Sequence, residues 1–174
     1  MSTLQRITTD YNEQEDRLTI AGLTDTNETV LFWLTMRLAS RLISHCLGIL
    51  EKDVPESKNV SKINEQSKKN IQSFAQQSAE ARLKQETAVK VTDNSPKLLI
   101  VKIDVKNSSA GVTLTLKQEC GNGYQIFLNS QQFRQWLGML FTVWQKTEWP
   151  TKIWPDWMSS DSSLPNISGE ISVH

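Results

Sequence analysis

The expected fold is decided by the stretch Leu31-Phe32-Trp33-Leu34-Thr35-Met36-Arg37-Leu38-Ala39-Ser40-Arg41-Leu42. Its first four residues are apolar on both faces, as in a central strand. Thr35 is a suitable helix N-cap, and after it apolar residues recur at helical spacing as far as Leu50. The stretch therefore predicts a strand that leads directly into a helix, Met36–Lys52, which ends before the next proline.

A later stretch has the same pattern: Gln125-Ile126-Phe127-Leu128-Asn129-Ser130-Gln131-Gln132-Phe133-Arg134-Gln135-Trp136. Here Asn129 or Ser130 is the cap, and the predicted helix is Ser130–Lys146. Two segments of alternating hydrophobicity precede each stretch and predict further strands. These segments are about 6–11 and 18–23 in the first half, and about 99–106 and 112–117 in the second.

The chain thus contains the unit strand–strand–strand–helix twice, offset by 94 residues. One explanation is an internal duplication that gives a pseudo-symmetric platform. The other is that a strand, a cap and a helix are a common way to leave a sheet, because the twelve aligned positions share few identities. Both explanations predict an α+β fold, an antiparallel β-sheet built of two β-meander–helix units with about three helices packed on it.

Residues 1–158 are expected to form a single α+β domain, and residues 159–174 a disordered C-terminal tail. A polar linker, 53–64, lies inside the domain. A weaker helix is expected from about 65 to 85, and it docks on a larger element because its apolar stripe is thin. That predicted stripe consists of Ile71, Phe74, Ala75, Ser78, Ala79 and Arg82.

The 174 residues carry 19 basic and 19 acidic side chains, so the formal net charge is zero. This balance excludes the whole-protein positive field that is usual in nucleic-acid-binding proteins. The N-terminus lacks the apolar run of a secretory signal, and the apolar stretch 30–50 is interrupted by Arg37, Arg41 and His45. The sequence therefore predicts a soluble, cytoplasmic protein with no membrane partner.

Groups suited to catalysis are few. His45 precedes Cys46, so the two side chains point to different faces of a helix and cannot form a nucleophile–base pair alone. His174 and Cys120 are isolated, and both cysteines are expected to be reduced thiols. The sequence contains neither the paired ligands of a zinc site nor a glycine-rich phosphate loop. We therefore expect no enzymatic activity, no catalytic residue, no metal and no cofactor.

Glu13, Glu15 and Asp16 form an acidic cluster between the first two predicted strands. Carboxylates of this kind bind divalent cations, but the cluster lacks the spacing of a calcium-binding loop. The alternative is a solvated hairpin turn, which we favour.

A local basic strip consists of Lys58, Lys62, Lys68 and Lys69. Together with Arg37 and Arg41, it suggests contacts with nucleic-acid phosphates. Acidic residues are interleaved with the lysines, and the strip has no aromatic side chain on which bases stack. A nucleic-acid-associated accessory factor is therefore the alternative hypothesis, not the leading one.

The most distinctive stretch is Trp149-Pro150-Thr151-Lys152-Ile153-Trp154-Pro155-Asp156-Trp157-Met158. Burial of one tryptophan stabilises a protein by several kcal/mol, about 25 cal/mol for each Å² covered, so these side chains need a cover. One possibility is an intramolecular clamp over the domain's own sheet or helices. A second is a partner-binding surface of Trp149, Ile153, Trp154 and Trp157, and a third is stacking of the indoles on a sugar or a nucleobase. The leading hypothesis is a non-catalytic protein-interaction or assembly module that binds another protein or a second copy of itself.

Overall fold

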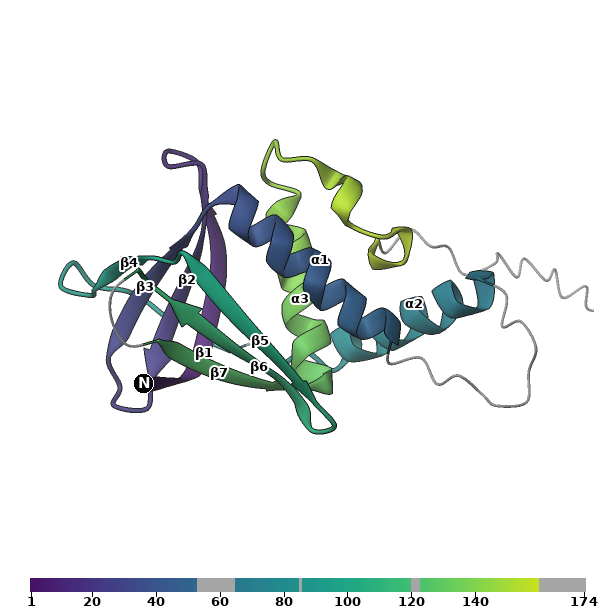
Figure 1. Cartoon of the computed structure of the whole chain (residues 1–174), viewed down its shortest axis with the longest axis horizontal. Helices are drawn as coiled ribbons and strands as arrows, with labels where there is room; N and C mark the ends of the chain where they lie inside the picture. Colours follow the sequence, from purple (N-terminus) through teal and green to yellow (C-terminus); the bar gives the residue numbers. More distant parts are fainter. Residues whose placement is uncertain (53–64, 85, 120–122, 160–174) are drawn as a thin grey trace, which may run out of the picture.

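The computed structural model describes residues 1–52, 65–84, 86–119 and 123–159. In this part of the chain, seven strands form one curled sheet on one side of the molecule, and three α-helices lie on the other side (Figure 1). The strands are β1 (Ser2–Asn12), β2 (Arg17–Thr24), β3 (Thr29–Leu34), β4 (Lys97–Leu99), β5 (Lys102–Ser108), β6 (Gly111–Lys117) and β7 (Tyr124–Asn129). The helices are α1 (Met36–Lys52), α2 (Glu65–Ala81) and α3 (Ser130–Trp144), followed by the 3-10 turns η1 (Thr151–Ile153) and η2 (Asp156–Met158).

The sheet is mixed, in the order β4-β3-β2-β1-β7-β6-β5. The expected α+β class and the antiparallel pairing within each half are confirmed. The expectation of a wholly antiparallel sheet is corrected, because β1 is parallel to β7 and β3 is parallel to β4. Each parallel pair joins a strand from the first half of the chain to one from the second, β1–β7 in the middle of the sheet and β3–β4 at its edge. Alternation within a single strand does not reveal such a partner.

The parallel pairs arise because the first strand segment of each half pairs with strands of both halves. In the second half this segment is divided into β4 and β5. In β1, Ser2 and Thr3 pair with β7, whereas the rest of the strand pairs with β2. In the second half, β4 pairs with β3, and two residues later β5 pairs with β6. The switch occurs at Ile100 and Val101, whose N–H groups donate to the carbonyls of Trp33 and Lys117, each at 3.0 Å. The two edge strands of the sheet are therefore consecutive in the chain.

The pairing registers of the two halves also match at an offset of 94 positions. The match holds for the antiparallel pair of the second and third strands and for the parallel pair that joins the halves. The matched pairs are Ile20–Phe32 with Leu114–Ile126, and Leu31–Lys97 with Gln125–Thr3.

The helices α1 and α3 begin at the same offset and are capped in the same way. The hydroxyl of Thr35 accepts from the N–H of Leu38 at 3.3 Å, and the side chain of Asn129 accepts from the N–H of Gln132 at 2.9 Å. These caps satisfy N–H groups that the first turn of a helix leaves free. Buried residues at matched positions are Ala39, Leu42, Ile43, Cys46, Ile49 and Leu50 in α1, and Phe133, Trp136, Leu137, Leu140, Val143 and Trp144 in α3.

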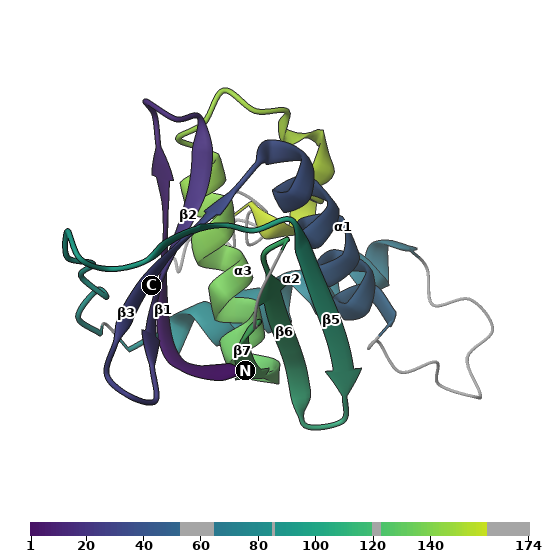
Figure 2. The ribbon, with the colours of Figure 1, turned by 60° about the vertical axis from the view of Figure 1, so that its left-hand side comes forward.

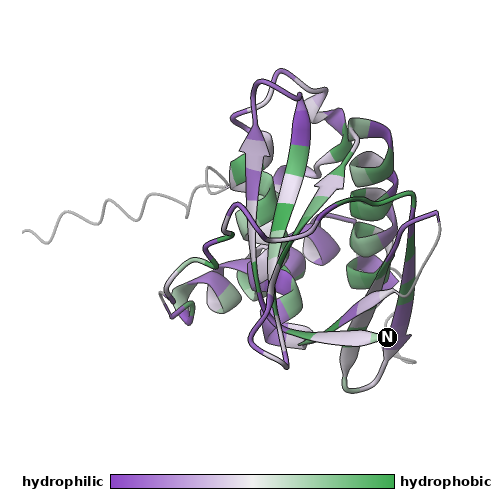
Figure 3. Ribbon diagram, turned by 90° about the vertical axis from the view of Figure 1, so that its left-hand side faces the viewer, coloured by the Kyte–Doolittle hydropathy of each residue, from purple (hydrophilic) through white to green (hydrophobic). Residues whose placement is uncertain are grey.

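Both helices pack on the sheet and share one core with it. The helix α1 contacts β2 and β5, and Figure 2 shows it beside β5. The helix α3 contacts β6 and β1, which are the matched strands of the other half, and also β7. Hydrophobic and hydrophilic residues alternate along the strands, as Figure 3 shows, so each strand turns one face to this core.

The helix α2 is where expected, but its predicted apolar stripe is only partly right, because Ala79 is buried and Ala75 and Ser78 are partly buried, whereas the rest of the stripe is exposed. Phe74 and Ile71 are 73% and 46% exposed, whereas Gln72 and Gln76 are buried beside Ala79. The buried glutamines face main-chain carbonyls of α1 and α3, partners that the apolar spacing of α2 does not reveal. The side-chain amide of Gln72 donates to the carbonyl of Leu50 near the end of α1, where helical carbonyls lack a partner within the helix.

Further amide contacts hold α2 on α3. The side chain of Gln76 donates to the carbonyl of Arg134 at 3.0 Å, and Gln135 donates to the carbonyl of Ala79 at 2.8 Å. Arg134 in turn donates to the side-chain oxygen of Gln72 at 2.8 Å. The side-chain amides of Gln72, Gln76 and Gln135 thus each donate to a main-chain carbonyl, which offsets the cost of burying their N–H groups.

The substitution Phe74→Ser distinguishes the observed packing of α2 from the predicted one. We expect the free energy of unfolding to change by less than about 0.5 kcal/mol, because the side chain is exposed. The control Ala79→Phe enlarges a buried side chain and should cost about 1–3 kcal/mol. Urea unfolding followed by circular dichroism measures both. A Phe74→Ser loss above about 2 kcal/mol would mean that Phe74 is buried, as the sequence pattern predicts.

The predicted linker 53–64 and the tail residues 160–174 lie outside the described residues, as do Cys120 and His174. None of the helices in the described part is long and apolar enough to cross a membrane.

Candidate functional site

The tryptophan-rich segment packs on the chain itself. Trp149, Trp154 and Trp157 are only 6%, 7% and 6% exposed. Trp144 of α3 lies at the centre, with ring centroids 4.9 Å from Trp149 and 6.0 Å from Trp154, both edge to face. Phe141 adds a further edge-to-face contact with Trp154 at 5.2 Å. Such pairs stabilise a core beyond the area that they bury.

Two prolines shape this segment. Pro150 and Pro155 each precede a 3-10 turn, so the chain folds back in two short steps after α3 ends. The carbonyl of Pro150 accepts from the indole N–H of Trp144 at 3.2 Å. Ile153, between the prolines, is partly buried against the core.

Trp149 also ties the segment to the N-terminal hairpin. Its indole N–H donates to a carboxylate oxygen of Asp16 at 2.6 Å, and the hydroxyl of Tyr11 donates to the same oxygen at 2.7 Å. The hydrogen bond to Asp16 raises the pKa of Tyr11 to about 12. One of the carboxylates in the acidic cluster 13–16 is therefore engaged by side chains, and no group of acidic, histidine and cysteine residues suited to a metal ion occurs in the described part.

In the described chain, the tryptophans contact the protein's own helices and hairpin, which is the arrangement that the clamp alternative predicts. Binding of a partner by Trp149, Ile153, Trp154 and Trp157 stays a prediction.

The basic strip is interrupted by carboxylates. Lys58 and Lys62 lie outside the described residues. Lys68 and Lys69 are exposed at the start of α2, beside Glu51 and Glu65. The ammonium of Lys69 lies 3.8 Å from a carboxylate oxygen of Asp156. Arg37 and Arg41 are near the other end of α1, so among the described basic residues the structure does not bring Arg37 and Arg41 together with Lys68 and Lys69.

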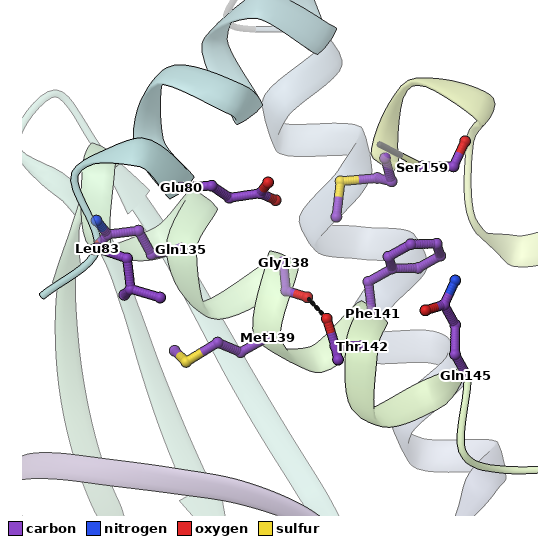
Figure 4. Close-up of a pocket in the computed structure, with 10 residues that line it drawn as sticks. Glu80, Leu83, Gln135, Gly138, Met139, Phe141, Thr142, Gln145 and Ser159 are labelled. Atoms are coloured by element: carbon purple, nitrogen blue, oxygen red, sulfur yellow. Dashed lines mark hydrogen bonds between the residues drawn. The ribbon is translucent and has the colours of Figure 1, made fainter. Parts of the chain in front are cut away.

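A hollow of about 400 Å³ lies between α2, α3 and the end of η2 (Figure 4). Glu80 is the one charged side chain among its lining residues, and the nearby hydroxyl of Thr142 donates to the carbonyl of Gly138 at 3.1 Å. Figure 4 shows these groups on separate elements around the opening. Among these lining residues, no base is paired with a nucleophile.

A larger hollow, about 560 Å³, runs between α1 and β5, and we call it the α1–β5 groove. One wall consists of Leu38, Arg41, Leu42 and His45 of α1. The other wall consists of residues 101–106, which are Val101 and the first five residues of β5. Because β5 is the last strand of the sheet, the groove follows a sheet edge.

The α1–β5 groove has a basic rim. Arg41, Lys102 and Lys106 are exposed around it, and Asp104 is the one carboxylate among its lining residues. Lys117 and Lys102 contact Asp104 at 2.6 and 3.1 Å, and these contacts lower the pKa of its carboxyl. None of the ion pairs within the described residues includes Arg41 or Lys106.

Lys102 and Lys106 were not predicted as site residues. Their signal is present in the sequence, since Lys102, Asp104 and Lys106 alternate with apolar residues along one strand. The sequence does not show that β5 faces α1 across a groove, because α1 and β5 lie about fifty residues apart in the chain.

His45 and Cys46 lie on different faces of α1, as expected. Cys46 is completely buried, and burial raises the pKa of its thiol to about 12, so it stays protonated and unreactive. His45 is exposed on the groove. Comparison of the chain with protein-family models, with curated proteins and with solved structures gave no significant match.

Proposed function

We propose that the protein is a non-catalytic protein-interaction module and that the α1–β5 groove is its docking surface. The observation that carries this proposal is the open groove of about 560 Å³ along an edge strand. Proteins normally shield the edge strands of their sheets, since unpaired main-chain groups attract other chains. An accessible edge with its own groove is a common basis for recognition of a second chain.

Exposed apolar side chains support this assignment. Val101, which lines the groove and lies between β4 and β5, is 50% exposed, and Leu99 at the end of β4 is 45% exposed. An exposed apolar side chain on the groove favours a protein partner, because covering it removes apolar surface from water. The partner is either another protein or a second copy of this chain.

The tryptophan cluster has a supporting role in this proposal. It joins α3 to the N-terminal hairpin through Trp144, Trp149 and Asp16, and thereby fixes the sheet against which α1 packs. A rigid platform lowers the entropy cost of binding. The predicted contacts of Ile153, Trp154 and Trp157 with a partner remain a second way for the module to bind.

We also propose that the two β-meander–helix units arose by internal duplication. Support comes from the common offset of 94 positions in strand registers, helix starts, caps and buried positions. The common strand–cap–helix connection explains why a capped helix follows a strand in each half. It does not explain why the strands of both meanders pair in the same register.

Nucleic-acid binding has less support. Lys69 faces Asp156, and the lining residues of the α1–β5 groove include no phenylalanine, tyrosine or tryptophan on which a base stacks. It is therefore treated as an alternative outcome of the experiments.

The double variant Arg41→Glu, Lys106→Glu tests the proposed function. With tagged full-length protein as bait in a lysate of the source organism, we expect proteins retained by the wild type to fall by roughly tenfold or more, because the groove rim changes sign. The matched control Lys84→Glu, Lys90→Glu makes the same change in charge at exposed positions after α2 and should retain them. Quantitative mass spectrometry of cross-linked eluates is the measurement.

Melting curves establish that both double variants fold. The proposed function fails if the groove variant and its control retain the same set of partners, or if the retained material is nucleic acid that nuclease treatment removes.

A further inference from the structure

The helix of each half faces a strand of the other half: α3 faces β1, and α1 faces β5. The two halves fill this space between helix and strand differently. In the second half, Trp136 of α3 is 2% exposed and its indole N–H donates to the hydroxyl of Thr9 in β1 at 3.2 Å. The matched position of α1 is Leu42, whose side chain is much smaller than an indole. Leu42 lines the α1–β5 groove. The α1–β5 groove therefore lies beside the position that matches Trp136, whose indole connects α3 to β1.

The groove has the length of a short strand. Six consecutive residues, 101–106, form one wall, and at about 3.3 Å per residue they span roughly 20 Å. Because β5 ends the sheet, no strand of the described chain pairs with its outer edge. An extended segment of about six residues matches this wall in length and can bond to its main chain.

The side chains define the occupant's chemistry. Arg41, Lys102 and Lys106 outnumber the single carboxylate of Asp104, which its two lysine neighbours already hold. The apolar side chains of Leu38, Leu42 and Val101 also line the groove. Acidic side chains match the rim, and apolar side chains at alternate positions match the floor, since alternate residues of a strand face the same side.

We infer that the α1–β5 groove binds an acidic, extended protein segment with apolar residues at alternate positions, which adds to β5 as a further strand. This inference rests on the proposed function and specifies its partner class. Main-chain hydrogen bonds to β5 supply affinity, and the cations with the apolar floor supply selectivity.

The probe is a blocked peptide of about eight residues that alternates glutamate and valine. Added to isotope-labelled full-length protein, it should shift the amide resonances of residues 38–45 and 101–106 in a saturable way. We expect a lysine–valine peptide of equal length to bind at least roughly tenfold more weakly, because it carries the charge of the rim. A glutamate–valine peptide N-methylated at alternate amides should bind as weakly, because it cannot complete the strand ladder.

Two groove variants and one control show whether the peptide binds in the α1–β5 groove. Arg41→Glu, Lys106→Glu should weaken binding roughly tenfold or more, whereas Lys84→Glu, Lys90→Glu should leave it unchanged. Leu42→Trp gives α1 the side chain that α3 carries and should block the groove sterically. If Leu42→Trp does not fold, the charge variants still decide the result.

Each outcome has one meaning. The inference is overturned if the acidic peptide shifts no groove resonance at the highest soluble concentration, if the N-methylated peptide binds equally well, or if oligothymidylate binds the groove instead. Groove-dependent capture of a protein partner alongside a failed peptide titration leaves the proposed function standing and removes only the acidic, extended occupant. Loss of both removes both.

Discussion

Replacement of Trp144 with alanine should lower the free energy of unfolding by about 4 kcal/mol, the largest loss that we expect from a single core side chain. Trp144 is completely buried and contacts the rings of Trp149 and Trp154, and its N–H is bonded to Pro150. Its removal leaves a cavity and also withdraws the surface on which the tryptophan segment rests.

Guanidinium unfolding followed by circular dichroism measures this loss without relying on the fluorescence of the deleted indole. Trp33→Ala is the matched control, because Trp33 is only partly buried on β3 and should lose less than about half as much. A Trp144→Ala protein within about 1 kcal/mol of the wild type would contradict the central place of the cluster in the core.

Gly111→Ala should cost more than about 3 kcal/mol or prevent folding. Gly111 begins β6 with φ +149°, a conformation that L-residues rarely adopt, and a Cβ there would collide with the carbonyl oxygen of Leu128 in β7. Neither group can move away, since both belong to the paired backbone of the second meander.

The control is Gly48→Ala. Apart from Gly48 itself, its chain neighbours and the nearby backbone of its own helix, no atom lies within 4 Å of the position that its Cβ would take. Gly48 sits inside α1, where alanine should stabilise the helix by about 0.5–1 kcal/mol. The two glycine substitutions therefore have opposite expected signs in the same thermal or denaturant unfolding measurement. Equal effects would contradict the geometry of the β5–β6 turn.

Local signals in the sequence predict the helices well. Thr35 and Asn129 mark the helix starts, and α1 has the predicted bounds because its cap, its apolar spacing and its terminator all agree. The predicted end of α3 at Lys146 is two residues beyond the observed Trp144. Helix ends commonly fray into a tighter turn.

The sequence predicts poorly what depends on neighbours that are distant in the chain. Phe74 looks inward-facing by spacing, yet α2 buries Gln72 and Gln76 because its contacts are carbonyls of α1 and α3. Likewise, the alternation of β5 predicts a strand, but not that it ends the sheet beside α1. Packing against elements distant in the chain decides both the buried face of α2 and the position of β5 in the sheet.

The bond between Trp149 and Asp16 bridges 133 positions of the chain. During synthesis on the ribosome, the β1–β2 hairpin emerges long before the indole that it holds, and β7, the parallel neighbour of β1, also comes late. Contacts of this separation form slowly, because a large loop must close first. The nascent first half therefore has an uncovered core surface until the chain has been synthesised as far as Trp149, and exposed apolar surface of this kind is what chaperones protect.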